Sequence, residues 1–311
     1  MSNTHRIRAG LRRACLVAAI AAVASASLST AHAARAHHEE PAVVKLLIHY
    51  QANGDRTRLA YVLVPRWYGR ANDPPIPLVI APHGAGPGPF LELARAWGDL
   101  PALGSFAVVI PEGQGRVLAH YSWGYSGQID DLARMPEIVE QAIPWLHVDP
   151  HRVYAVGGSM GGQESLLLVA RYPRLLAGAV SFDAPGDMGL RYQQYGRLPD
   201  GPFMQGLLRS EFGGTPDDDP AAYAERSPVA AAAAIARSGV PVQIWWSRED
   251  HLIVDQRLHS GRLYTELRRL NPEDHVAEVV GMWPHTAEMR WDRRLPDALR
   301  FLGLLDPATT P

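Results

Sequence analysis

The chain has 311 residues, of which 47% are hydrophobic and 20% charged, and its formal net charge is −2. This balance is typical of a globular protein and excludes a disordered or fibrous chain. The sequence contains no Lys/Arg-rich run beyond its N-terminal segment, so we expect no nucleic-acid partner.

Residues 1–33 have the pattern of a cleavable signal peptide. Four arginines precede an apolar stretch, residues 15–28, which is shorter than the roughly 20 residues of a membrane-spanning helix. Ala31-His32-Ala33 then supplies the small-residue cleavage pattern. We therefore expect a secreted or periplasmic protein with no stable membrane anchor. An uncleaved anchor is the alternative, and Arg12-Arg13 leaves open whether export uses the twin-arginine route.

A polar leader at residues 34–41 precedes a domain expected over residues 42–305, and residues 306–311 form a tail. Strand and helix patterns alternate along this domain, which predicts an α/β fold with a mostly parallel sheet and helices on both faces. Strands are predicted at residues 43–50, 59–64, 77–81, 106–110, 152–156, 177–182, 242–246 and 275–280. Helices are predicted at residues 90–97, 129–146 with a kink at Pro136, 159–171, 230–236, 256–270 and 292–304.

Residues 184–240 interrupt the alternation of strands and helices. This stretch is rich in glycine and proline, and only its alanine-rich part, residues 230–236, has a helical pattern. Long excursions of this kind in a compact domain usually carry function or move. We interpret residues 184–240 as a small cap or lid over the site and not as a second domain.

The stretch Gly157-Gly158-Ser159-Met160-Gly161 matches the pattern G-x-S-x-G. An apolar strand is predicted before it and a helix after it, which is the setting of a nucleophilic serine on a sharp strand-to-helix turn. The alternative is a glycine-rich turn without chemistry. The local context favours Ser159 as a nucleophile.

A serine hydroxyl needs a base to remove its proton. His285 follows the last predicted strand, in Gly281-Met282-Trp283-Pro284-His285, and is our candidate base. The chain order serine, acid, histidine then requires an acid between Ser159 and His285. Asp250, just past the strand at residues 242–246, is the leading candidate, and Glu249, Asp255 and Asp183 are its rivals.

A negatively charged oxygen in the reaction would need two N–H donors. One is the N–H of Met160, at the start of the helix after the serine. The other is expected from Pro82-His83-Gly84-Ala85-Gly86, with the Ala85 N–H preferred and Gly84 as the alternative. The sequence has no H-E-x-x-H, paired-cysteine or phosphate-binding glycine motif, so we expect neither a metal nor another cofactor.

Aromatic residues gather where a substrate would bind. Tyr121, Trp123 and Tyr125 lie in a loop expected at the carboxyl end of the sheet, and Trp283 is two residues before the candidate base. An aromatic pocket suits the acyl or aryl group of a small-molecule ester. The sequence gives no indication of the oligomeric state.

Further short motifs accompany the serine. They are His83-Gly84, residues 149–153, Gly162, Tyr172-Pro173, residues 212–216, Tyr223 and Ser227-Pro228. With Ser159, Asp250 and His285, they resemble the α/β-hydrolase superfamily over residues 42–305. The resemblance is to the branch that holds the prolyl oligopeptidase catalytic domain and secreted feruloyl and acetyl esterases.

This resemblance implies a catalytic triad of Ser159, Asp250 and His285. The sequence departs from this branch in one respect. Oligopeptidases of the branch carry a large N-terminal propeller domain that selects peptides by size, and this sequence has no counterpart of it. We therefore expect a secreted serine hydrolase that cleaves carboxylic esters through an acyl-enzyme. The alternatives are a serine peptidase of the prolyl oligopeptidase type and a non-catalytic binding protein on the same fold.

Overall fold

A computed structural model describes residues 42–273, 275–290 and 294–308. The predicted signal peptide, residues 1–33, and the leader, residues 34–41, lie outside the described residues, as do Asp292 and residues 309–311 of the tail. Among the described residues, no helix is long and apolar enough to cross a membrane.

In the described part of the chain, eight strands form one sheet in the order β1-β2-β4-β3-β5-β6-β7-β8. Only the pairs β1–β2 and β2–β4 are antiparallel, and the other neighbours run parallel. The prediction of a mostly parallel sheet is therefore confirmed. The strands are β1 (Val43–Ala52), β2 (Arg56–Pro65), β3 (Ile76–Ile80), β4 (Ala107–Pro111), β5 (Val148–Gly158), β6 (Gly178–Phe182), β7 (Val242–Ser247) and β8 (Val276–Gly281).

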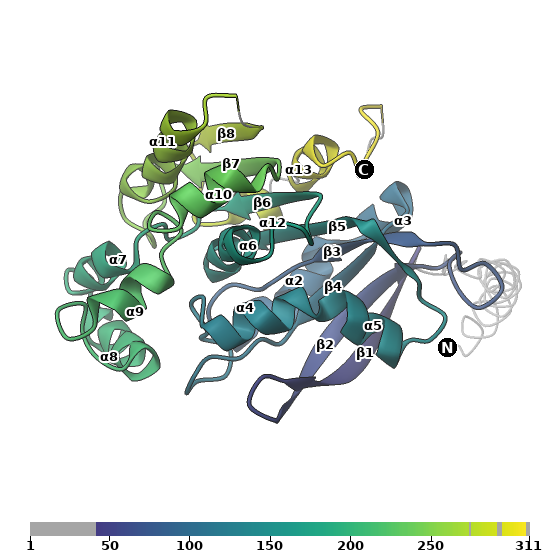
Figure 1. Ribbon diagram of the computed structural model, residues 1–311, viewed down its shortest axis with the longest axis horizontal. Helices are drawn as coiled ribbons and strands as arrows, with labels where there is room; N and C mark the ends of the chain where they lie inside the picture. Colours follow the sequence, from purple (N-terminus) through teal and green to yellow (C-terminus); the bar gives the residue numbers. More distant parts are fainter. Residues whose placement is uncertain (1–41, 274, 291–293, 309–311) are drawn as a thin grey trace, which may run out of the picture. The chain divides into compact units, whose positions relative to one another are not determined.

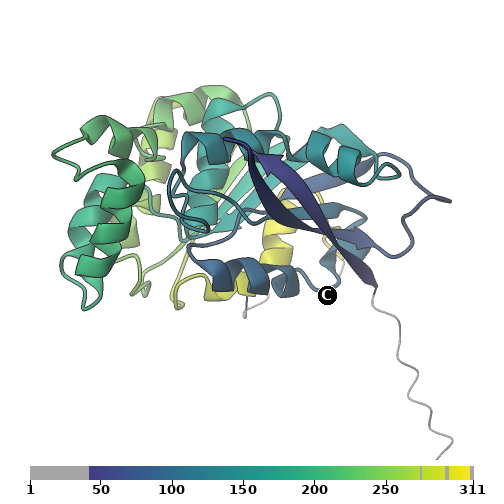
Figure 2. The same ribbon diagram turned by 90° about the horizontal axis from the view of Figure 1, so that it is seen from below.

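Helices cover both faces of the sheet, as the alternating pattern predicts, and Figure 2 shows the sheet between the two layers. One layer consists of α4 (Ser126–Ala133), α5 (Met135–Ala142), α6 (Met160–Arg171), α10 (Ala232–Ser238) and α11 (Ser260–Leu270). The other consists of α2 (Pro87–Ala96), α3 (Leu100–Gly104), α12 (Ala287–Arg290) and α13 (Leu295–Phe301). The short helices α3 and α12 were not predicted, because one helical turn leaves little periodic signal.

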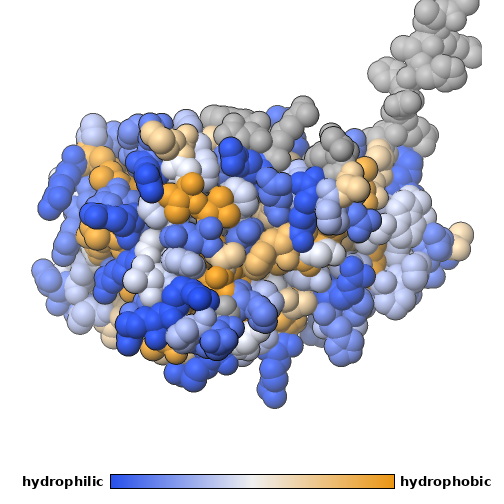
Figure 3. Space-filling model, turned by 90° about the horizontal axis from the view of Figure 1, so that it is seen from above, coloured by the Kyte–Doolittle hydropathy of each residue, from blue (hydrophilic) through white to orange (hydrophobic). Residues whose placement is uncertain are grey.

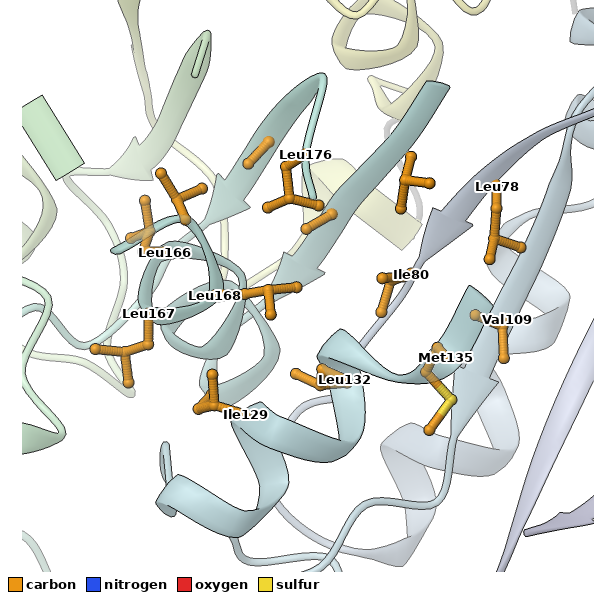
Figure 4. Packing of buried hydrophobic residues seen from close by; sticks show 14 of the residues in the cluster. Leu78, Ile80, Val109, Ile129, Leu132, Met135, Leu166, Leu167, Leu168 and Leu176 are labelled. Carbon is orange, nitrogen blue, oxygen red and sulfur yellow. The ribbon is translucent and has the colours of Figure 1, made fainter. Parts of the chain in front are cut away.

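Alternate residues of the central strands pack against opposite helix layers. Leu78 and Ile80 of β3 join the cluster around α4, α5 and α6, as Figure 4 shows, whereas Val79 between them joins the cluster around α2 and α13. Successive side chains of a strand point to opposite faces, so a sheet covered on both sides needs continuous apolar runs. Those runs are the strand signal in the sequence.

Residues 184–240 are more regular than their glycine and proline content predicts. They form α7 (Met188–Tyr195), α8 (Gly201–Phe212), α9 (Pro220–Glu225) and α10. Helices α7, α8 and α9 lie together at one end of the sheet, at the left of Figure 1. Their apolar cluster includes Trp123 and Met160, so this end of the molecule is joined to the start of α6. Helix α10 instead packs on α6 and α11 over the sheet.

The surface seen in Figure 3 is largely hydrophilic, and hydrophobic residues form patches within it. The exposed large hydrophobic residues include Phe203 on α8 and Leu252 in the loop after β7. Both lie in segments that border the cavity described below.

Candidate active site

Ser159 lies at the turn between β5 and α6 in a strained backbone conformation, with φ 58° and ψ −125°. Such values are rare for a residue with a side chain, and they persist only where the surroundings enforce them. The Ser159 N–H donates to the Phe182 carbonyl oxygen at 2.8 Å, which ties the turn to the end of β6. The turn therefore presents the hydroxyl at the carboxyl edge of the sheet.

Glycines on both sides of Ser159 allow the chain to pass close to itself. A Cβ atom at Gly161 would collide with the carbonyl oxygen of Pro82, and one at Gly157 would collide with the backbone of Gly161. The loop after β3 thus runs directly against the start of α6, and a Cβ atom at Gly84 would lie 3.6 Å from the Ser159 Cβ. The G-x-S-x-G pattern is a steric requirement of this crossing.

His285 and Asp250 are joined by a hydrogen bond of 2.7 Å between Nδ1 and Oδ2. The Asp250 carboxylate also accepts the N–H groups of Leu252 and Ile253, at 2.9 and 2.8 Å, and the Gln256 amide at 2.9 Å. Burial opposes the charge of Asp250, but His285 and these donors hold its pKa below the usual value. An ionised Asp250 fixes the proton of His285 on Nδ1.

The other ring nitrogen of His285, Nε2, is buried and makes no hydrogen bond within the described part of the chain. His285 and Ser159 line the same cavity. A histidine with Nδ1–H held by a carboxylate has its lone pair on Nε2, so this nitrogen can take a proton from a hydroxyl. The arrangement is suited to general-base chemistry at Ser159.

The rival acids do not bond His285 among the described residues. Asp183, at the end of β6, accepts the backbone N–H groups of Ser247 and Thr286, both at 2.8 Å, and the Trp283 indole at 3.2 Å. It therefore holds the segment on either side of His285. Glu249 is exposed, and Asp255 pairs with Arg257 at 3.6 Å.

A second buried acid lies beside Asp183. Glu288 on α12 is fully buried, and neither of its carboxyl oxygens has a hydrogen-bond partner within the described residues. Burial, followed by the charge of Asp183, raises the pKa of Glu288 well above its usual value. Burial also raises the pKa of Asp183. Glu288 is therefore neutral near pH 7 and adds no second negative charge beside Asp183.

The ligand atoms of Asp183, Asp250 and His285 lie within 4.8 Å of one another, close enough for a cation to be considered. Their chemistry argues against a metal, because the oxygens of both carboxylates already accept N–H donors. Carboxylates that hold a cation direct their lone pairs to it. The cluster fits a hydrogen-bonded histidine and not a metal centre.

The two predicted N–H donors border the same cavity as Ser159. Met160 is the first residue of α6, where N–H groups have no partner within the helix and favour negative charge. Ala85 follows Gly84 in the loop after β3, and both residues line the cavity. His83 is buried, with Nε2 at 2.6 Å from the Glu112 carbonyl oxygen, and so anchors this loop.

The cavity above Ser159 has a volume of about 530 Å³. Of the four predicted aromatic residues, Tyr121 and Trp123 line it, and their rings lie 5.4 Å apart. Tyr125 and Trp283 do not line it, so the prediction was wrong for these two. The Tyr125 ring lies instead against Arg226, at 5.5 Å, and Trp283 is 4% exposed and packs on Trp245.

Sequence reasoning missed most of the opposite wall of the cavity. These residues come from α7, α8, the loop between them, the loop after β7 and helix α12, and they are Arg191, Tyr195, Leu198, Met204, Leu252, Ile253 and Met289. They follow no spacing that a linear pattern would reveal. The only signal was the glycine- and proline-rich excursion that contains α7 and α8.

Glu164 on α6 holds the loop that carries Tyr121 and Trp123. It is buried and accepts hydrogen bonds from the Ser122 hydroxyl, the Gly124 N–H at 3.3 Å and the Gln128 amide at 3.4 Å. Burial raises its pKa from 4.5 to about 7, although these donors oppose the shift. Between pH 4.5 and 7 the folded protein therefore binds more protons at Glu164 than the unfolded chain does.

We expect this difference in proton binding to lower stability as pH rises across the same window. The stabilisation from this extra proton is fully present below pH 4.5 and lost above pH 7, and a pKa rise from 4.5 to about 7 corresponds to about 3 kcal/mol. The glutamine in Glu164→Gln cannot ionise. As pH rises from 4.5 to 7, the unfolding free energy of the wild type should therefore fall relative to that of the variant. Urea unfolding at several pH values measures this, and parallel pH profiles for the two proteins would contradict it.

Neither a family model nor a curated protein matches this sequence. Solved structures do match. Acylaminoacyl peptidase from Pyrococcus horikoshii aligns with a TM-score of 0.63 and 14% identity, over 88% of this chain and 44% of that one. The present chain thus spans less than half the length of that peptidase.

Two smaller enzymes match over most of their length. An esterase from Pyrococcus furiosus gives a TM-score of 0.56 and 14% identity, over 83% of this chain and 90% of that one. An S-formylglutathione hydrolase from Agrobacterium tumefaciens gives a TM-score of 0.60 and 13% identity, over 86% of this chain and 98% of that one. Identities this low establish the fold alone. The chain has the α/β-hydrolase fold, and the predicted resemblance is confirmed at that level.

Proposed function

We propose that this chain, which has the α/β-hydrolase fold, is a secreted serine hydrolase that cleaves carboxylic esters through an acyl-enzyme. Ser159 is the nucleophile, His285 the base and Asp250 the acid that orients it. The observation that carries the proposal is the 2.7 Å bond between Asp250 and His285 at the cavity that the strained Ser159 also lines.

The proposed reaction moves one proton through His285 in each half. Nε2 takes the proton of Ser159 as Oγ attacks the ester carbonyl, and the oxygen that becomes negative accepts the N–H groups of Met160 and Ala85. The imidazolium, stabilised by Asp250, then gives its proton to the leaving alkoxide as the C–O bond breaks. Water repeats the sequence on the acyl-enzyme, with Ser159 as the leaving group.

The lining of the cavity supports an ester in place of an extended peptide. Tyr121, Trp123, Leu198 and Met204 provide apolar and aromatic surface, which binds through area more than through directional hydrogen bonds. Cleavage of an amide also requires protonation of a poorer leaving group by the histidine, so its geometric demands are stricter.

We therefore expect kcat/KM for short-chain or aryl esters to exceed that for matched aminoacyl anilides by at least about 10²-fold. The measurement is a panel of 4-nitrophenyl esters, feruloyl esters and aminoacyl 4-nitroanilides on the protein that begins at Ala34. Comparable or greater turnover of the anilides would overturn ester hydrolysis in favour of peptidase activity. Absence of turnover and of fluorophosphonate labelling would favour a binding protein.

Export is the second part of the proposal and rests on residues 1–33, outside the described residues. The arginine-rich start, the short apolar stretch and Ala31-His32-Ala33 support cleavage after Ala33. Intact-mass measurement of exported protein should give an N-terminus at Ala34. Exported material that still carries residues 1–33 would contradict the signal peptide.

A further inference from the structure

Among the described residues that line the cavity, Arg191 on α7 is the one buried arginine. Its side chain lines the cavity wall, and the residue is only 2% exposed. The guanidinium lies over the Tyr195 ring at 3.8 Å. No hydrogen bond or ion pair joins it to any other described residue, and Nη1 is buried without an acceptor.

Arg226 provides the comparison, because it is the other arginine buried among the described residues, at 5% exposure. Its Nη1 donates to the Ser122 carbonyl oxygen at 3.2 Å, and its Nη2 donates to that of Glu211 at 3.1 Å. The Glu211 carboxylate lies 3.9 Å from Nη1. Buried charges in proteins are normally satisfied in this way. Arg191 differs in that its buried Nη1 has no acceptor among the described residues.

The described ionisable groups near Arg191 are neutral, paired with other residues or exposed. Burial, followed by the charge of Arg191, lowers the pKa of His259 to about 4, so this histidine is neutral at pH 7. The Asp187 carboxylate pairs with Arg262 at 3.2 Å and accepts the Leu190 N–H at the start of α7. Asp200, an acid that lines the cavity, is exposed, and no ion pair joins it to Arg191 within the described residues.

We infer that Arg191 binds a carboxylate of the substrate, so that the preferred ester carries an anionic group on an apolar body. The inference rests on the proposed function and specifies its substrate class. A guanidinium presents a planar fork that matches a carboxylate in two hydrogen bonds, and the Tyr195 ring beneath it holds the plane of the fork. Low exposure to water strengthens this attraction relative to a surface site.

The kinetic test compares esters that differ only in charge. On the acyl side, 4-nitrophenyl hemiesters of succinate, glutarate and adipate are paired with their uncharged methyl esters. On the alcohol side, 4-carboxyphenyl butyrate is paired with its methyl ester. The wild type should favour the anionic member of at least one pair by at least about tenfold in kcat/KM, as one charge-assisted hydrogen-bond pair provides.

Arg191→Gln should lower this ratio at least about tenfold, and Arg191→Lys should retain part of it, because lysine keeps the charge without the fork. The control is Arg197→Gln, which removes an exposed arginine just beyond α7 and should keep the wild-type ratio. A wild type without anionic preference in any pair would overturn the inference. An equal loss of kcat/KM for the charged and the uncharged ester of a pair in Arg191→Gln would also overturn the inference, because such a loss would indicate a structural role for Arg191.

A binding measurement decides the inference without turnover. In the Ser159→Ala protein, calorimetric titration should show 4-phenylbutyrate binding at least about tenfold more tightly than 4-phenylbutyramide. The difference should disappear when Arg191→Gln is added to a protein whose thermal unfolding remains cooperative. Equal affinity for the acid and the amide would refute the carboxylate site while leaving ester hydrolysis intact. A wild type that neither turns over esters nor is labelled at Ser159 would instead contradict the proposed function.

Discussion

Replacing Ser159 with alanine is expected to lower kcat for ester hydrolysis by about 10⁴-fold or more. Without Oγ no acyl-enzyme forms, and the remaining donors at Met160 and Ala85 can only polarise the ester for attack by water. The protein should remain folded, because alanine adds no atoms to the crowded turn and removes only a hydroxyl. Steady-state kinetics with a 4-nitrophenyl ester measures the loss, and thermal unfolding checks the fold.

Ser165→Ala, on the helix that follows Ser159, is the matched control. The Ser165 hydroxyl is buried and donates to the Gly161 carbonyl oxygen at 2.8 Å, away from the cavity lining. A fluorophosphonate should label the wild type and Ser165→Ala but not Ser159→Ala. Turnover by Ser159→Ala above roughly a tenth of the wild-type rate would remove this residue from the nucleophile role.

Asp250→Asn is expected to lower kcat by about 10⁴-fold. An amide can donate to Nδ1 of His285, which places the imidazole proton on Nε2, where it blocks attack by Ser159. The shape of the side chain is almost unchanged, so thermal unfolding should detect a folded protein. Kinetics of the purified variant at several pH values measures the effect.

Asp183→Asn is the informative comparison, because Asp183 lies close to His285 without bonding it. It accepts the Thr286 N–H and the Trp283 indole, so its loss should disturb the position of the histidine segment and the stability of the protein. We expect a smaller loss of kcat than in Asp250→Asn. A folded Asp183→Asn that is severely impaired, beside a mildly impaired Asp250→Asn, would assign the acid to β6.

The candidate site divides into residues that a linear pattern can locate and residues that it cannot. Ser159 and Met160 were located because the strand, the glycines and the helix are adjacent in the sequence. Tyr121 and Trp123 were placed at the cavity because their loop follows a strand. Trp283 was misplaced. Its position beside the candidate base was known, but its indole turns toward Asp183 and the core.

The sequence by itself determined where the strands of the sheet lie along the chain and where the serine turn lies. Apolar runs of strand length arise because both faces of the sheet are covered, and the G-x-S-x-G glycines are required where Pro82 crosses α6. These are short-range constraints of backbone sterics and side-chain periodicity, so a short stretch of sequence is enough to reveal them.

Only the tertiary structure decided which acid reaches His285 and what surrounds Ser159. Asp183 and Asp250 both follow parallel strands, and their roles differ only in which atoms they meet across the loops. The sequence also could not show that Nη1 of Arg191 lacks an acceptor among the described residues, because this depends on where α7 places the Arg191 and Tyr195 side chains at the cavity wall. Such contacts join segments far apart in the chain, and they arise from the summed packing of many side chains with no local period.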